Sequence, residues 1–154
     1  MDIQKLTNWF RFRNAADLQA NELAEELTQL KLMKLLYLAQ GVYLAAFNKP
    51  LFNDPIVAWK YGPAVESVHQ RFAGQRGIVG NISDNDRGDY QEVEQNTDVS
   101  LVMNAVYDTY GDMSASDLVK LTHSQSPWRD TKQSQEISRE SMQSYFLQNV
   151  LSND

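Results

Sequence analysis

The fold is decided by residues 28–47, which read TQLKLMKLLYLAQGVYLAAF. Thr28 is a favourable N-cap residue and Asn-Lys-Pro follows Phe47, so the pattern predicts one long helix. Its apolar residues recur at helical spacing on both faces: Leu32, Leu35, Leu36, Ala39, Tyr43 and Ala46 on one, Leu30, Met33, Tyr37, Leu38 and Val42 on the other. A helix that is apolar almost all round belongs at the centre of a domain. Gly41 costs about 1 kcal/mol relative to alanine there, which predicts that another element packs closely against it.

The rest of the chain predicts a mainly α-helical domain, with about six helices around the central helix and at most a short strand or hairpin. A first helix is marked by apolar residues at helical spacing, namely Ile3, Leu6, Trp9 and Phe10. A polar connection follows it and runs to about residue 26. A further helix is expected over residues 63–72, with Pro63 as its first residue, and another over 99–110, with Gly111 as its stop. The last two helices are expected from the N-cap Ser114 to about Thr122 and after the N-cap Ser138. Non-helical segments are expected at residues 51–61 (an edge strand or irregular segment), at 81–98 (a turn or short hairpin with little structure) and at Pro127–Trp128 (a turn).

Length and composition favour a single domain over residues 1–154. The chain is 42% hydrophobic, has no cysteine and carries 14 basic and 20 acidic side chains, a formal net charge of −6. The absence of cysteine excludes disulfides, iron–sulfur clusters and thiolate zinc sites. No apolar run approaches the roughly 18 residues of a membrane span, and the mixed first 13 residues do not form a signal peptide. We therefore expect a cytoplasmic protein with no membrane partner.

The charges are unevenly distributed along the chain. Residues 31–80 hold six basic and two acidic side chains, whereas residues 81–117 hold nine acidic and one basic. The basic residues form no dense cluster and no aromatic platform lies among them, which argues against nucleic acid as a partner. We interpret the acidic stretch as a solvated loop, with attraction of a basic partner as the alternative.

Motifs for metal, phosphate or cofactor binding are incomplete. Residues 83–94 have the spacing of a calcium loop, but serine stands at position one and arginine at position five, where oxygen ligands are needed. The glycines of residues 74–80 lack the strand and the lysine of a phosphate-binding loop. His69 and His123 alone are too few for a histidine zinc site. We expect neither a metal nor a cofactor.

His123 admits three interpretations, one of which is contact with a partner. It lies at the end of a predicted helix, where a histidine can hydrogen-bond the last carbonyl groups. A hydrolase would instead combine it with nearby polar residues, namely Ser114, Ser116, Asp117, Ser124 and Ser126. The chain has no G-x-S-x-G nucleophile motif, so we favour the capping role and assign no catalytic residue.

Lys34 lies on the most apolar helix, with Leu30, Tyr37 and Leu38 around it on the helical surface. An ammonium in that position must reach solvent, pair with a carboxylate or meet a partner. A structural pairing is the first expectation and a partner contact the second.

Several segments, in this order, carry a family resemblance: LTQLKLMKLLY at 27–37 with Gln40-Gly41, AWKYGP at 58–63, LVKLTH at 118–123 with SPW at 126–128, and SYF at 144–146. The combination resembles the Panacea domain, the SocA-like antitoxin family that includes phage-associated GepA-like proteins. The resemblance covers roughly residues 25–147, and residues 1–24 add the N-terminal helix and polar connection. Its motif residues, which we interpret mainly as scaffold, are Leu32, Lys34, Leu35, Tyr37, Gly41, Trp59, Gly62, Pro63, Leu118, Thr122, His123, Pro127 and Trp128. We expect Trp59 and Trp128 to be core anchors.

The resemblance implies a non-enzymatic antitoxin, often encoded on a prophage or mobile element, that binds and neutralises a toxin protein from a neighbouring gene. One alternative is a proteolytic adaptor that delivers the toxin to a ClpXP-type protease. A second is a DNA-binding autoregulator, which the net charge opposes. Because such a family meets varied toxins, we predict recognition through variable surfaces, with Trp9, Lys34, Asp84 and Asp86 as candidate partner contacts. The sequence leaves the oligomeric state and the toxin's identity open.

Overall fold

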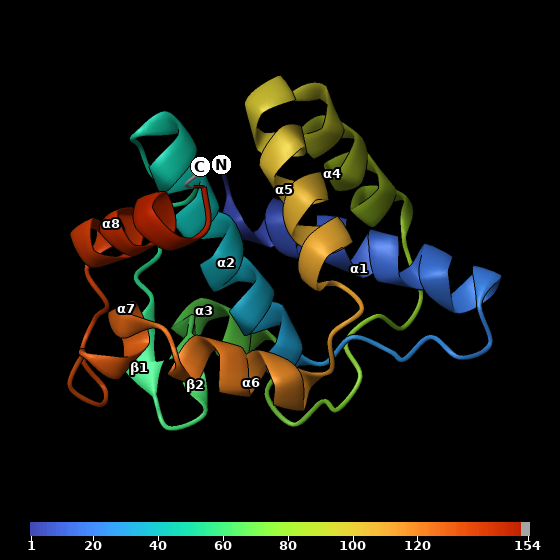
Figure 1. Cartoon of the computed structure of the whole chain (residues 1–154). Coiled ribbons are helices and arrows are strands. Elements are labelled where there is room, and N and C mark those ends of the chain that lie inside the picture. Colours follow the sequence, from blue (N-terminus) through green and yellow to red (C-terminus); the bar gives the residue numbers. More distant parts are fainter. Residues whose placement is uncertain (152–154) are drawn as a thin grey trace.

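Helix α2 (Gln29–Phe47) runs through the middle of the protein and is packed on by elements from both ends of the chain (Figure 1). The structure, a computed structural model, describes residues 1–151. Every residue of α2 from Leu32 to Leu44 is buried, as the two apolar faces predict. By length and composition α2 could also cross a membrane, but 72% of that apolar span is buried inside the protein. Its central position in the core accounts for its hydropathy.

Seven further helices and one two-stranded antiparallel hairpin surround α2 within residues 1–151. In chain order they are α1 (Ile3–Ala20), β1 (Val57–Trp59), β2 (Gly62–Ala64), α3 (Glu66–Arg71), α4 (Asp84–Gln95), α5 (Thr97–Tyr110), α6 (Ala115–His123), α7 (Ser126–Arg129) and α8 (Arg139–Asn149). The mainly α fold with one short hairpin is thus confirmed. The sequence predicts six helices when α2 is counted, and the two that it does not predict are α4 and the four-residue α7.

The elements pack on α2 from different sides. Helix α5 covers one side and is followed outward by α4 and α1, which pack against each other, while α8 covers the opposite side (Figure 1). The hairpin, α3 and α6 gather beside the N-terminal half of α2. This last group is the one that builds the candidate site described below.

Local sequence sets the ends of α2 and its closest contact. The Thr28 hydroxyl accepts a hydrogen bond from the backbone N–H of Lys31 at 3.3 Å, and Asn48 ends the helix in the left-handed conformation, with φ of 57°. A Cβ atom on Gly41 would lie 2.3 Å from the ring of Phe146, so α8 approaches α2 here more closely than any side chain permits. The predicted close packing at Gly41 is confirmed.

The prediction of little structure over residues 81–98 is wrong, because most of this stretch forms α4. Ser83 and Asp86 make a capping box: the Ser83 hydroxyl accepts from the N–H of Asp86, and the Asp86 carboxylate accepts from the N–H of Ser83. The helix buries only Val93 and Asp86, and an apolar pattern this sparse hides it from sequence reasoning.

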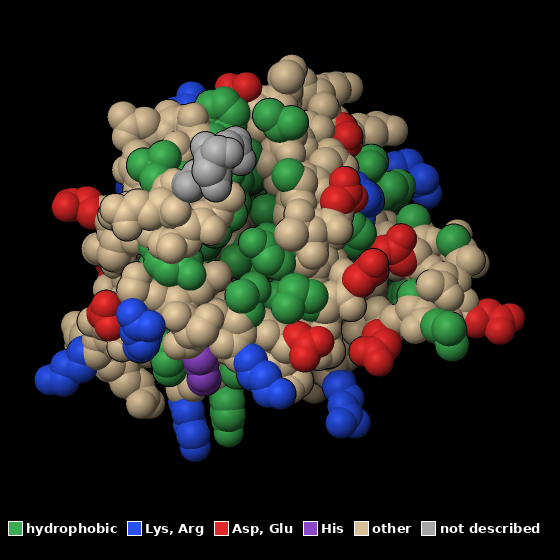
Figure 2. Space-filling model, in the orientation of Figure 1, with side chains coloured by type: hydrophobic (Ala, Val, Ile, Leu, Met, Phe, Trp, Pro, Cys, Tyr) green, Lys and Arg blue, Asp and Glu red, His purple; other side chains and the backbone are tan. Residues whose placement is uncertain are grey.

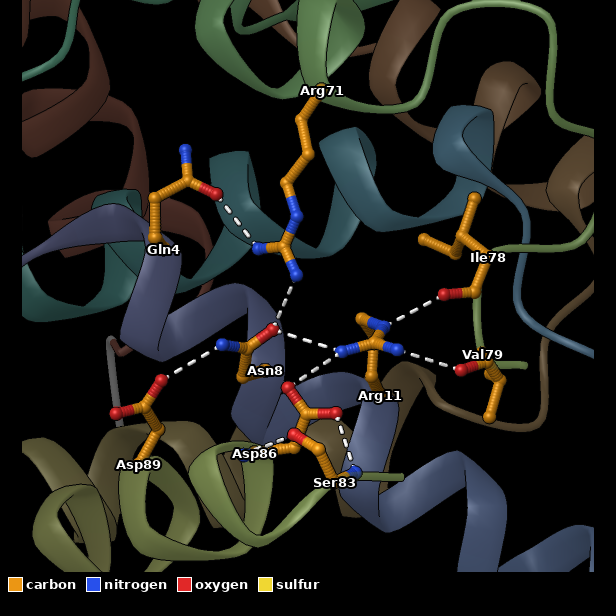
Figure 3. A network of polar contacts seen from close by, with 9 residues as sticks. All are labelled: Gln4, Asn8, Arg11, Arg71, Ile78, Val79, Ser83, Asp86 and Asp89. Carbon is orange, nitrogen blue, oxygen red and sulfur yellow. Dashed lines mark hydrogen bonds and ion pairs between the residues drawn. The ribbon is translucent and has the colours of Figure 1, made fainter. Parts of the chain in front are cut away.

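A buried arginine joins α4 to α1 (Figure 3). Arg11 pairs with Asp86 at 2.9 Å and donates to the carbonyl oxygens of Ile78 and Val79, each at 2.7 Å. Burial alone would raise the pKa of Asp86, but the hydrogen bonds from Ser83 and the charge of Arg11 outweigh it and hold that pKa below its ordinary value. Arg11 therefore fixes α4 and the segment before it on α1.

The segment around Pro63 also differs from the prediction. Residues 62–64 form strand β2, which pairs with β1 so that Ala58 lies opposite Pro63, and helix α3 begins only at Glu66. Gly62 has φ of 114°, a left-handed conformation that suits glycine and turns the chain into β2. A proline after a turn is compatible with the start of a helix or with a short edge strand, so it does not separate the two.

Candidate functional site

A pocket of about 350 Å³ lies between the first turns of α2, the β1–β2 hairpin and α3. Its lining is almost wholly apolar in character, with a few basic and amide side chains: Gln29, Leu30, Met33, Lys34, Trp59, Lys60, Tyr61, Gly62, Ala64 and His69. The volume is at the lower end of the range for protein ligand pockets. Eight of these ten residues lie in the segments 27–37 and 58–63, which carry the family resemblance.

The hairpin supplies one wall and the mouth of the pocket. Trp59 is half-buried at the end of β1, and Tyr61 in the turn keeps 60% of its surface exposed. The ammonium of Lys60 lies 5.5 Å from the centre of the Tyr61 ring. Figure 2 shows basic side chains and a hydrophobic side chain projecting at the end of the molecule where this hairpin lies.

Lys34 forms part of the pocket wall and is only 1% exposed. Its Nζ donates to the carbonyl oxygen of Pro63 at 3.0 Å, and within residues 1–151 it forms no ion pair with a carboxylate. Burial lowers its pKa to about 7. The structural pairing expected for Lys34 is therefore made by a backbone carbonyl rather than by an acid.

Gly62 lets the hairpin approach Lys34. A Cβ atom at Gly62 would lie 2.7 Å from Cε of Lys34 and 3.0 Å from the hydroxyl oxygen of Thr122 on α6. Together with its left-handed φ, this close approach accounts for a glycine at this position. At Gly62 the hairpin thus packs directly between Lys34 of α2 and Thr122 of α6.

His69 closes the pocket on the side of α3. Its Nδ1 lies 2.8 Å from Oε1 of Gln29, and its ring meets the Trp59 ring edge-on at 5.2 Å between centres. His69 itself is exposed. The pocket is lined by two lysines and a histidine and by no Asp or Glu.

The remaining motif residues support the hairpin from behind. Trp128 donates from its indole N–H to the carbonyl oxygen of Trp59 at 2.8 Å, and Tyr37 donates to the side chain of Gln125 at 2.8 Å. The aliphatic and hydroxyl residues Leu32, Leu35, Leu118, Thr122 and Pro127 are buried. Trp59 and Trp128 are only half-buried at the edge of the core, less enclosed than the predicted anchors.

His123 does not cap the last carbonyls of α6, contrary to the prediction. Its ring stacks on Trp128 with 3.9 Å between centres and 10° between planes, and its Nε2 is buried without a hydrogen-bond partner. The Ser124 hydroxyl donates to the carbonyl of Leu121 at 2.6 Å instead of approaching the histidine. In the part of the chain that the structure describes, no serine–histidine pair forms, and no cluster of three or more metal-ligating side chains was found.

Burial contradicts two of the four predicted partner contacts. Trp9 is fully buried and donates from its indole N–H to Glu94 at 2.8 Å, and Asp86 is 6% exposed beside Arg11. Asp84, at the start of α4, is exposed, so its partner contact stays a prediction. Lys34 is only 1% exposed, but it lies in the wall of an open pocket, so its partner contact also stays a prediction.

Sequence reasoning missed Lys60, Tyr61 and Met33 as site residues. The signal that the sequence offered for Lys60 and Tyr61 was their position in a turn, between Trp59 and Gly62. An exposed aromatic at such a turn favours contact with a partner rather than a role in the core.

A second hollow, of about 360 Å³, lies between α5 and α8 on the face shown in Figure 2, where hydrophobic side chains gather in the centre of the view. It is lined in part by Val42, Val106 and Tyr110. Among residues 1–151 no charged side chain lines it, and its lining residues lie outside the segments of the family resemblance. The pocket beside the hairpin is therefore the stronger candidate.

Comparison with known proteins agrees with the resemblance of the motif segments. The family model described as antitoxin SocA-like, Panacea domain, matches residues 32–129. Antitoxin SocA of Caulobacter vibrioides (strain NA1000 / CB15N) is 35% identical over 109 residues, which are 66% of this chain and 58% of that protein. The match thus spans less than two-thirds of this curated relative. No solved structure matches the chain.

Proposed function

The chain belongs to the SocA-like antitoxins with a Panacea domain, and from that premise we propose that it is an antitoxin that neutralises a toxin protein by binding it directly. The observation that carries the proposal is the extent of the family match, which runs from residue 32 to 129 and so includes the motif residues of α2, the hairpin, α6 and α7. The chain acts by binding alone and catalyses no reaction.

The pocket beside the hairpin supports a binding role. An apolar hollow with an exposed aromatic at its mouth, here Tyr61, is typical of the anchor regions of protein interfaces. A stable complex should bury at least about 1,000 Å² in total, more than the pocket alone provides. The surface around the hairpin and the start of α2 must therefore take part.

Co-expression tests this function. The gene is expected to lie beside the toxin gene, on a prophage or another mobile element, so each adjacent open reading frame is expressed with and without this protein. We expect one neighbour to arrest growth alone, growth to resume with this protein, and the two proteins to co-purify in a fixed ratio. If no toxic neighbour is neutralised and no complex is recovered, the antitoxin function is wrong.

The half-life of the toxin separates two modes of neutralisation. Direct masking predicts an unchanged half-life and a stable complex in cells that lack ClpXP. A proteolytic adaptor predicts a shorter half-life that depends on ClpXP. We propose masking, because it requires only the binding surface described above.

A further inference from the structure

We propose that the pocket between α2, the hairpin and α3 is the surface that binds the toxin, and that it accepts an acidic segment of the toxin. A large apolar side chain of that segment fills the pocket, and a neighbouring carboxylate pairs with Lys60 and Lys34. This inference rests on the proposed function, and it adds the place and the chemistry of the contact.

The shape of the pocket selects an apolar side chain. Its walls are built by Leu30 and Met33 of α2, by Trp59 of β1 and by Ala64 of β2, and Tyr61 stands exposed at the mouth. Burial of an aromatic or large aliphatic side chain against such walls removes apolar surface from water on both partners. The exposed ring of Tyr61 would close over the inserted side chain.

The charge of the pocket selects an acidic neighbour for that side chain. Two lysines and a histidine line the pocket, and no carboxylate of residues 1–151 does, although the whole chain carries a formal net charge of −6. The site is thus locally basic on an acidic protein. A carboxylate on the partner complements the site, whereas a basic partner segment would be repelled.

Lys34 makes the preference for an acid stronger. An ammonium has three hydrogen-bond donors, and the structure gives this one a single acceptor, the carbonyl of Pro63. A buried ammonium without a counter-ion is unfavourable, so a carboxylate that enters the pocket supplies the missing charge and the missing acceptor. Burial lowers the pKa of Lys34 to about 7, which is the same unfavourable effect of removing its charge from water.

Binding of three variants to the toxin identified by co-expression tests the surface. Lys60→Glu and Tyr61→Ala change exposed residues of the hairpin turn, and both should keep the melting temperature of the wild type. Lys49→Glu makes the same change of charge just beyond the C-terminal end of α2. By the rise of the helix, this position lies about 25 Å from the first turns of α2, which line the pocket. We expect Kd to rise at least fivefold for Lys60→Glu and Tyr61→Ala and to stay within twofold for Lys49→Glu.

The outcomes keep this inference apart from the proposed function. If the wild type neutralises a neighbouring toxin but Kd rises less than fivefold in both hairpin variants, the pocket is not the contact surface and this inference is overturned. If the wild type neutralises no toxin, the proposed function has failed instead, and this inference falls with it.

Carbodiimide cross-linking tests the chemistry of the partner segment. The reagent joins a lysine amine to a carboxylate that contacts it, so mass spectrometry of the treated complex should find Lys60 linked to an Asp or Glu of the toxin beside a large apolar residue. Lys60→Arg keeps the positive charge but cannot be joined, so the complex should persist while this link disappears. Cross-links that join the toxin only to lysines outside the pocket would overturn the acidic-segment assignment.

Discussion

At the scale of single residues, the ammonium of Lys34 opposes folding. Its pKa is lowered by burial from an ordinary 10.5 to about 7. Between these two pH values the unfolded chain keeps the proton that the folded chain has lost, so the free energy of unfolding rises with pH over this window. Below pH 7 both states are protonated and the unfavourable burial of the charge is fully present.

Replacing Lys34 by methionine should therefore stabilise the protein near neutral and acidic pH. At pH 6 we expect Lys34→Met to raise the free energy of unfolding by roughly 1–4 kcal/mol, because methionine has a similar length and no charge to bury. The difference from the wild type should shrink as pH rises from 7 towards 10. Urea unfolding of both proteins over this range measures it, and a difference that does not change with pH would contradict the account of Lys34.

Gly41 and Gly88 are both glycines within helices, but their surroundings differ. A Cβ atom at Gly41 would collide with the Phe146 ring, whereas at Gly88 on α4 it would meet nothing within 4 Å. We expect Gly41→Ala to destabilise the protein by about 1–3 kcal/mol through the forced shift of α8. Thermal unfolding with calorimetry provides the measurement.

Gly88→Ala is the matched control for Gly41→Ala. Because alanine is favoured over glycine in a helix and Gly88 has free space around it, this substitution should stabilise the protein by up to about 1 kcal/mol. Two changes of the same chemistry should thus have opposite signs. Stabilisation by both would show that α8 does not pack on Gly41 as described.

At the scale of elements, the sequence predicts those helices whose signals are local. Helix α2 carries its apolar residues and its Thr28 cap within its own segment, and Ser114 and Ser138 cap α6 and α8 as predicted. Helix α4 could not be predicted in this way, because the residues that hold it lie far away on α1, among them Arg11, 75 positions before Asp86. A residue that is polar in the sequence and buried by a distant partner gives no periodic signal.

Arg11 should be decisive for α4. Arg11→Met leaves the buried carboxylate of Asp86 without its cation and the carbonyls of Ile78 and Val79 without this donor. We expect a loss of about 3–5 kcal/mol in the free energy of unfolding. In hydrogen exchange, the amides of α4 should lose protection before those of α2, because α4 is the element that Arg11 holds.

Lys5→Met is the control for Arg11→Met on the same pair of helices. Lys5 pairs with Glu92 of α4 at 2.6 Å, but this ion pair is exposed to solvent. Exposed pairs contribute little to stability, so the denaturation midpoint should stay at that of the wild type. If Lys5→Met were as destabilising as Arg11→Met, the general charge balance between α1 and α4, and not the buried network, would hold the two helices together.

At the scale of the whole molecule, the candidate site is assembled from segments far apart in the chain. The motif residues could be identified from the sequence, but the meeting of three of them, Lys34, Trp59 and Gly62, in one pocket could not, because it depends on how α6 and α7 place the hairpin against α2. The hydrogen bond from Trp128 to the carbonyl of Trp59, across 69 positions, makes this placement. The same dependence on tertiary structure explains why Trp9 was expected on the surface and is found in the core.

Hydrogen exchange of the toxin complex should trace the binding surface over the whole molecule. If the toxin binds at the pocket, binding should slow exchange in the hairpin turn at Lys60 and Tyr61 and in the first turns of α2, because partner atoms exclude water from the exposed turn and from the mouth of the pocket. Helix α4 packs on α1 and α5, away from the hairpin (Figure 1), so its start around Asp84 should exchange as in the free protein. The reverse pattern, with protection at Asp84 and none at the hairpin, would move the interface to the acidic side and favour a basic toxin segment instead. The two surfaces carry opposite charge, so one experiment decides between them and also fixes the sign of the charge that the toxin must present.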